Sequence, residues 1–217
     1  MFLQRMKTVR RFKRHKRFHK KFKRVFTGLP KNLFTNNNLA TYDVSTTDII
    51  DSGSTVNLLF VPQRTNNSFQ DRHGDRTVIR SFRLLYTIKP GTLQLTNQWV
   101  RITVFWDNQP NNAFPSAPLP FAAFTVTSLP DPQFTQRFRI LFDRQVLISP
   151  TNFESAAMIT GDLFKKNLAL TSVFTANAGG IADIQSGALN MLVIGDTANG
   201  ANANPVMTFS SRCKFDP

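Results

Sequence analysis

The sequence predicts an all-β protein, folded as a sandwich of two sheets and preceded by a strongly basic N-terminal arm. From about Thr41 onward, stretches rich in Val, Ile, Phe and Thr alternate with loops rich in Asn, Pro and Gly, which is the pattern of short strands and turns. About eight such stretches are separated by long connections, and this spacing favours a sandwich over a meander of hairpins. Positive charge is concentrated before the first of them.

Three stretches show the two-residue period of a strand that buries one face. Their apolar faces are formed by alternate residues: Arg80, Phe82, Leu84, Tyr86 and Ile88 within residues 78–88; Val100, Ile102, Val104 and Trp106 within 100–106; and Phe138, Ile140, Phe142, Val146 and Ile148 within 137–149. Further strands are expected near residues 41–50, 55–61, 166–175, 190–195 and 206–213.

One segment shows a different pattern. Residues 151–164 predict a short helix, in which Thr151 is the N-cap and Glu154 completes a capping box. Long connections are expected at residues 63–77, 108–121, 176–188 and 195–205. The second of these is expected to be a stiff surface loop because it contains Pro110, Pro115, Pro118 and Pro120.

The composition limits the chemistry that the chain can perform. Its 217 residues make room for one domain with a tail, and the 41% hydrophobic content provides a core. Cys213 is the only cysteine, which excludes an intrachain disulfide framework and a cysteine-built zinc site. With three histidines and a single glutamate, the chain has few side chains suited to acid–base catalysis. We therefore expect no enzyme activity, no cofactor and no bound metal.

Some polar residues resemble parts of a functional site, but a plainer interpretation is available. Asp107, Asp143 and Arg144 end strands, where such residues make turn hydrogen bonds or ion pairs between subunits. His73 stands in a polar loop with no second ligand at metal-binding spacing, so we expect a surface histidine.

Three other features have equally plain interpretations. Asp48 and Asp51 lack the spacing of a calcium-binding loop. Gly179 and Gly180 lack the strand and helix that flank a phosphate-binding loop, and we expect turn glycines. Cys213 alternates with apolar residues in the last strand and is expected to face the core.

Charge divides the chain into two parts. Lys and Arg number 27 against 13 Asp and Glu, which gives a formal net charge of +14. Residues 1–31 hold thirteen of the basic residues and no acid, whereas residues 32–217 hold fourteen basic and thirteen acidic residues. A nearly neutral body joined to a cationic arm is typical of a protein that binds a polyanion through a flexible extension. We therefore predict an arm of residues 1–31 and a folded domain of residues 32–217.

The arm predicts nucleic-acid binding, because its cations neutralise phosphates and its interleaved phenylalanines can stack on unpaired bases. The candidate contact residues are Arg5, Lys7, Arg10, Arg11, Phe12, Lys13, Arg14, Lys16, Arg17, Phe18, Lys20, Lys21, Phe22, Lys23 and Arg24. Repulsion between like charges favours a flexible arm when no partner is bound.

Two other interpretations of the arm remain open. Phe18, Phe22 and Phe26 have the i, i+4, i+8 spacing of a basic amphipathic helix that lies on a membrane or on a neighbouring subunit, so the arm could be partly helical. The same basic run could serve as a nuclear localisation signal.

Four stretches resemble the capsid proteins of small circular single-stranded DNA viruses, the circovirus-like group whose shells are similar to that of satellite tobacco necrosis virus. In order, they are residues 75–82 (DRTVIRSF), 100–111 (VRITVFWDNQPN), 137–144 (RFRILFDR) and 180–189 (GIADIQSGAL). The resemblance implies a single jelly roll of eight strands in two four-stranded antiparallel sheets. It also implies sixty copies in a small T=1 icosahedral shell, with the arm facing inward onto a single-stranded DNA genome.

The partners and location follow from this resemblance and from the basic run. We expect a virion protein whose partners are other copies of itself and the genome, and which assembles in the host nucleus after contact with nuclear import receptors. The sequence identifies no host-cell receptor.

Two other classes of protein remain open. One is a non-viral β-sandwich nucleic-acid-binding protein with a basic tail, and the other is a jelly-roll enzyme or lectin with an incidental basic tag. A dedicated binder usually spreads Lys and Arg over its folded face, whereas a shell protein can confine them to the arm. The nearly neutral body therefore favours the shell protein.

The isolated arm peptide should bind single-stranded nucleic acid with a log–log salt slope of about −8, because about twelve phosphate contacts release counterions. Titrations followed by fluorescence anisotropy should show weak sequence preference. Replacing Phe12, Phe18 and Phe22 with Leu should weaken single-strand binding more than duplex binding. Equal losses would contradict stacking on bases.

Overall fold

The computed structural model describes residues 39–52, 55–64, 70–115, 120–123, 125–150, 158–196 and 203–217. The chain divides into a unit of residues 1–38, which lies outside the described residues, and a body of residues 39–217. The predicted boundary after residue 31 therefore stays a prediction. No helix within the described part of the chain is long and apolar enough to cross a membrane.

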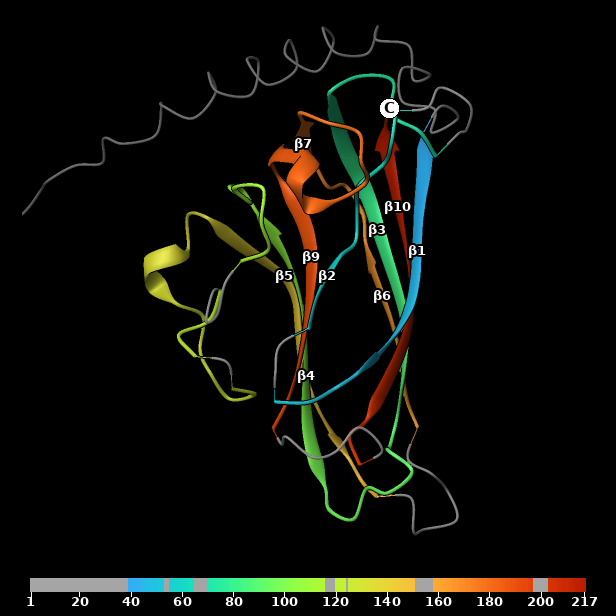
Figure 1. The fold of residues 1–217 in the computed structure, drawn as a ribbon, viewed down its shortest axis with the longest axis vertical. Helices are drawn as coiled ribbons and strands as arrows, with labels where there is room; N and C mark the ends of the chain where they lie inside the picture. The colour runs from blue at the N-terminus through green and yellow to red at the C-terminus, as the bar shows by residue number, and fades with distance from the viewer. Residues whose placement is uncertain are drawn as a thin grey trace, which may run out of the picture. The chain divides into compact units, whose positions relative to one another are not determined.

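The body consists of two antiparallel sheets (Figure 1). In the six-stranded sheet, β1 (Ala40–Ile49) pairs with β10 (Val206–Asp216), and β10 pairs with β3 (Arg76–Lys89). Both β6 (Ile159–Lys165) and β7 (Leu170–Phe174) pair with β3, and β8 (Ile184–Ser186) pairs with β7. The four-stranded sheet has the order β2 (Thr55–Leu58), β9 (Ala188–Gly195), β4 (Gln98–Asp107) and β5 (Phe138–Ile148). Two 3₁₀ turns, η2 (Pro132–Phe134) and η3 (Ile181–Asp183), lie in connections.

This strand order is that of a single jelly roll, as predicted. The chain crosses between the sheets after β1, β2, β3, β5, β8 and β9, and the last strand lies between the first and the third. The sheet of β2, β9, β4 and β5 has the predicted four strands, and the other sheet has the four predicted strand positions with β8 beyond them at its edge. Among the described residues the strands number ten instead of eight, because β6 and β7 share one position and the short β8 is added at the edge.

A β-bulge at Arg80 accompanies the break between β6 and β7. Lys214 pairs with Ser81 and Phe215 pairs with Ile79, so Arg80 is an extra residue on β3. The prediction that Arg80 shares the apolar face with Phe82 is therefore wrong: the bulge reverses the alternation, and Arg80 is exposed. β3 changes partner at the same point, from β6 at residues 82–88 to β7 at residues 76–79.

The main core lies between the two sheets. β4 contributes the four residues of its predicted apolar face, Val100, Ile102, Val104 and Trp106. The ring of Phe60 contacts Tyr42 and Phe215 edge-on, with ring centroids 5.7 and 5.1 Å apart. Cys213 is fully buried in this core, as predicted.

A second, smaller core covers the outer face of β4. Phe105 packs there against Phe121 and Phe138, under the connection between β4 and β5. The prediction that Phe138 and Ile140 share the apolar face of Phe142 is wrong. Phe105 pairs with Ile140 and Val104 pairs with Phe142, so a bulge at Leu141 turns Phe138 and Ile140 to the outer face.

The predicted helix at residues 151–164 is also wrong over its second half. Residues 159–165 form β6, in which half-buried or buried residues alternate with exposed ones. The ring of Tyr86 lies so close to Gly161 that a Cβ there would be 2.2 Å from it, so this position on β6 requires glycine. Thr151 and Glu154 lie outside the described residues.

Replacing Ile102 with Asp should abolish soluble protein, because an unpaired charge in the main core costs about 3–5 kcal/mol, which is comparable with the stability of a whole domain. The control Gln136→Asp, on an exposed residue of the β4–β5 connection, should change the free energy of unfolding by less than about 0.5 kcal/mol. Soluble yield and urea unfolding measure both effects. Equal tolerance at the two positions would contradict this core.

Candidate functional site

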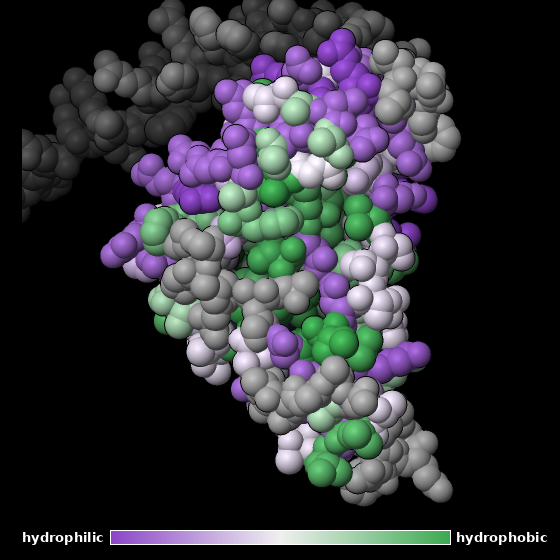
Figure 2. Space-filling model, in the orientation of Figure 1, coloured by the Kyte–Doolittle hydropathy of each residue, from purple (hydrophilic) through white to green (hydrophobic). Residues whose placement is uncertain are grey.

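The predicted nucleic-acid contacts, from Arg5 to Arg24, lie outside the described residues and stay predictions. The body presents its own charged surface. Figure 2 shows hydrophilic residues gathered at one end of the body, where β1 begins and β10 ends. At this end lie Arg64, Arg72, Arg76, Arg80 and Lys214, together with Asp75 and Asp216, which pair with Arg64, Arg72 and Arg80.

A row of four charges crosses the outer face of the six-stranded sheet. Arg212 donates two hydrogen bonds to Asp43, at 2.8 and 2.7 Å, and Arg83 donates two to Asp162, at 3.1 and 2.7 Å. The hydrogen bonds from Arg83 lower the pKa of the Asp162 carboxyl, and those of Asp43 raise the pKa of Arg212. Arg83 and Arg212 stand directly opposite each other, and the two aspartates offset their repulsion.

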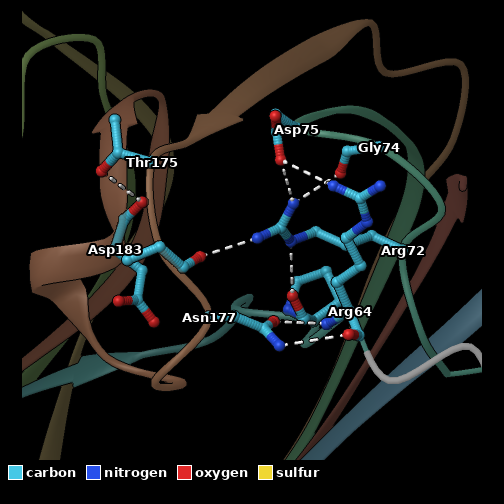
Figure 3. Close-up of polar contacts among 9 residues, drawn as sticks. Arg64, Arg72, Gly74, Asp75, Thr175, Asn177 and Asp183 are labelled. Carbon is cyan, nitrogen blue, oxygen red and sulfur yellow. Dashed lines mark hydrogen bonds and ion pairs between the residues drawn. The ribbon is translucent and has the colours of Figure 1, made fainter.

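Arg72 is the most deeply buried cation of the charged end, with 2% of its surface exposed (Figure 3). Its guanidinium donates to the carbonyl oxygens of Pro62 at 3.2 Å, Gly74 at 2.5 Å and Ala176 at 2.7 Å. It also pairs with Asp75 at 3.0 Å and lies 4.6 Å from the centroid of the Phe174 ring. One side chain thus joins the β2–β3 connection to the chain that follows β7.

The same two connections meet a second time through Asn177 (Figure 3). Its side-chain oxygen accepts a hydrogen bond from the backbone N–H of Arg64, and its Nδ2 donates to the Arg64 carbonyl oxygen at 3.1 Å. Beside it, the buried Asp183 accepts from the backbone N–H groups of Gly179 and Gly180, at 2.5 and 3.1 Å. Gly179 has a φ of +84°, which suits a turn glycine, as predicted.

Arg101 has a comparable role on the four-stranded sheet. It is 3% exposed, pairs with Asp143 at 2.6 and 2.8 Å, and lies 4.0 Å from the centroid of the Phe121 ring. Its Nη1 donates to the carbonyl oxygens of Val126 and Ser128, which fixes the β4–β5 connection. Burial alone raises the pKa of the Asp143 carboxyl, but the hydrogen bonds and charge of Arg101 outweigh it, so the pKa lies below its ordinary value.

The other strand-end residues also find partners within the chain. Asp107, which is fully buried, accepts two hydrogen bonds from Arg137, both at 2.9 Å, and one from the backbone N–H of Gln109 at 2.9 Å. The last of these is a turn hydrogen bond, as predicted. The ion pairs of Asp107 and Asp143, for which contacts between subunits were the other expectation, are formed inside one chain.

His73 is exposed, in agreement with the predicted surface histidine. Asp48 accepts a hydrogen bond from Asn57 at 2.7 Å. Within the part of the chain that the structure describes, no group of three His, Cys, Asp or Glu residues is placed to hold a metal ion. Burial raises the pKa of the Cys213 thiol, which keeps it protonated.

These contacts separate structural cations from available ones. Arg80 and Arg83 pair with Asp216 and Asp162, and Arg101 is buried. In contrast, Arg76 and Lys214 are exposed and form no ion pair with another described residue. They are therefore cations of the body that can meet a phosphate without breaking an existing pair.

Sequence reasoning missed the structural roles of Arg72 and Arg101. For Arg101 a signal was present, since a cation among the apolar residues of β4 requires a buried partner. For Arg72 no local pattern was available, because its carbonyl partners are supplied by distant segments.

Comparison with solved structures finds viral proteins of low identity. The chain is similar to a protein of Desmodium yellow mottle tymovirus, with 10% identity over 86% of this chain and 90% of that chain and a TM-score of 0.32. It is similar to a protein of deformed wing virus carrying the GFP gene, with 12% identity over 97% and 87% of the two chains and a TM-score of 0.29. A third is the BFDV capsid protein in a 60-mer, with 7% identity over 84% and 94% and a TM-score of 0.28.

No protein-family profile and no curated protein matches the chain. The jelly roll is established by the strand order and register of this chain itself.

Replacing Arg72 with Met should lower the free energy of unfolding by about 3 kcal/mol, because one buried and two partly buried carbonyl oxygens lose their donor. The matched change Arg64→Met removes a half-exposed guanidinium that lies 3.6 Å from the Asp75 carboxylate, and should cost less than about 0.5 kcal/mol. Urea unfolding of both variants measures the difference. Equal losses would show that Arg72 does not hold the two connections together.

Proposed function

We propose that the chain is a viral capsid protein. Its jelly-roll body self-assembles into a small icosahedral shell of sixty copies, and its basic arm packages single-stranded DNA inside that shell. The observation that carries the proposal is the separation of charge: thirteen basic residues and no acid within residues 1–31, against fourteen basic and thirteen acidic residues in the remainder.

The neutral body favours contacts between copies. Most arginines of the body are already paired with an aspartate of the same chain, as in the row from Asp43 to Asp162 and in the pairs of Arg101 and Arg137. Two such bodies can approach without strong mutual repulsion. Closed point-group symmetry then yields a particle of finite size.

The arm supplies charge on the scale that a small genome requires. Sixty arms of thirteen charges carry about 780 positive charges, comparable within a factor of a few with the phosphates of a genome of about one to two thousand nucleotides. The interleaved Phe12, Phe18 and Phe22 favour a single-stranded genome over a duplex, because unpaired bases offer faces for stacking.

The proposal includes a location and excludes catalysis. The protein belongs to the virion, and its basic run serves as a nuclear localisation signal recognised by import receptors before assembly. We propose no enzyme activity, because the carboxylates of Asp107 and Asp143 are held by arginines in structural contacts.

Deleting residues 1–31 should separate assembly from packaging. The full chain, expressed alone, should form uniform particles in negative-stain electron microscopy with an absorbance ratio at 260 to 280 nm that indicates nucleic acid. The truncated chain should keep its fold, since β1 begins at Ala40, and any particles that it forms should contain little nucleic acid.

Two outcomes would contradict the proposal. A full-length protein that remains monomeric at micromolar concentration in moderate salt would exclude a shell and favour a non-viral nucleic-acid-binding protein. Truncated particles with as much nucleic acid as the intact protein would move the binding site to the body, where Arg76 and Lys214 are among the exposed cations that form no ion pair with a described residue.

A further inference from the structure

The connection between β3 and β4 is a rigid loop at the end of the body opposite the charged end. Gln94 lies in it with only 1% of its surface exposed. Its Nε2 donates to the carbonyl oxygens of Thr96 and Ile148, both at 2.9 Å, and its Oε1 accepts from the backbone N–H of Gly91 at 3.2 Å. The loop is therefore fixed to the end of β5.

This rigid loop presents two leucines to solvent. Leu93 and Leu95, on either side of Gln94, are 63% and 78% exposed. Residues 90–100 contain no charged side chain. A single exposed leucine needs no explanation, but two leucines held outward by a buried glutamine form a preorganised apolar knob. Figure 2 shows apolar residues at this end of the body, in contrast to the hydrophilic opposite end.

A groove of about 560 Å³ lies near the same end, on the outer face of the four-stranded sheet. Its lining includes Trp99, Val126, Thr127, Gln145 and Asp196. Trp99 is 46% exposed, and its cross-strand neighbour Leu147 is 39% exposed. Asp196 is the one charged residue of the lining among the described residues.

The groove is also preformed. Gln145 Nε2 donates to the carbonyl oxygen of Val126 at 2.7 Å, and Arg101 donates to the same oxygen at 3.1 Å. The backbone N–H of Asp196 donates to the carbonyl oxygen of Trp99 at 3.1 Å. These bonds hold the walls in place without an occupant.

The knob does not fill the groove of its own chain. Leu95 and Trp99 are four positions apart, and the bonds of Gln94 keep the leucines in solvent. We propose that Leu93 and Leu95 of one copy insert into the groove beside Trp99 of the next copy, in a head-to-tail contact that closes a ring. This rests on the proposed function, because it describes how the copies of the shell meet.

Charge argues for a second copy as the occupant. The arm joins the body next to Ala40, at the charged end, so copies that converged there would bring thirteen positive charges each toward one axis. The knob is uncharged, and the groove carries one aspartate, so the same end of many copies can converge without repulsion. Because the knob and the groove are two different patches of one chain, their contact is heterologous, and such a contact yields a closed ring when the rotation closes.

The first test removes the knob from the full-length protein. Replacing Leu93 and Leu95 with Ser should raise the concentration for half-assembly at least about a hundredfold, because two leucines no longer become buried. Blocking the groove with Thr127→Arg, at an exposed position, should have the same effect. The control Thr96→Ser with Asn97→Ser alters the same loop and keeps both leucines, and it should assemble like the wild type. Light scattering measures assembly, and unchanged urea midpoints show that the variants fold.

The second test identifies the two sides of the contact. Cys213 is buried, so Leu95→Cys and Thr127→Cys introduce the reactive thiols. Treated with a short bismaleimide, particles assembled from a mixture of the two single variants should give crosslinked dimers, and particles of the double variant should give a ladder of higher oligomers. Neither single variant should crosslink alone.

The outcomes separate this contact from the shell itself. Wild-type particles together with normal assembly of the leucine variant would overturn the knob-and-groove contact and leave the shell proposal standing. Crosslinking of Leu95→Cys particles alone would also overturn it, since that indicates a two-fold contact between knobs. A wild-type protein that forms no particles would overturn both proposals.

Discussion

The burial of β4 on both faces is the constraint around which the rest of the body is arranged. One face supplies Ile102 and Trp106 to the main core, and the other supplies Phe105 to the second core. Because Arg101 lies on that second face, the fold must satisfy a buried cation there. It does so with Asp143 and with the carbonyl oxygens of the β4–β5 connection, which are thereby fixed over the sheet.

The same residue shapes the surface beyond it. By its hydrogen bond to the carbonyl oxygen of Val126, Arg101 fixes one wall of the groove beside Trp99. A side chain that is buried for reasons of stability thus determines the form of a surface available to another molecule. Arg72 has the same effect at the charged end. Its hydrogen bonds to Pro62 and Ala176 fix the conformation of two connections that strand pairing does not fix.

The strands could be predicted from the sequence because each buried face follows a two-residue period within one segment. The errors at Arg80 and at Phe138 arise from bulges, which depend on the register between two strands and leave no trace in either strand alone. The helix predicted at residues 151–164 extends over most of β6, because the cap expected at Thr151 outweighs a short alternation. Their pairing with β3, and the contact of Gly161 with Tyr86, are tertiary effects.

The cations also differ in how far the sequence alone could predict their roles. The arm could be predicted as a nucleic-acid-binding segment because thirteen basic residues without an acid are a property of composition, and that prediction stands untested. Which cations of the body are available could not be predicted, because Arg80 and Arg83 differ from Arg76 only in having an aspartate within reach on a neighbouring strand.

The position of β10 has a consequence for the time at which the body can form. Ser210 on β10 lies beside Ser45 on β1, although the two are 165 positions apart, and β10 also pairs along β3. During synthesis, β1 and β3 therefore keep unpaired edges, and the rings around Phe60 lack Phe215, until residues 206–216 have left the ribosome. A polysome thus carries chains that cannot yet present a finished surface to one another, and their association is postponed until translation has passed the last strand.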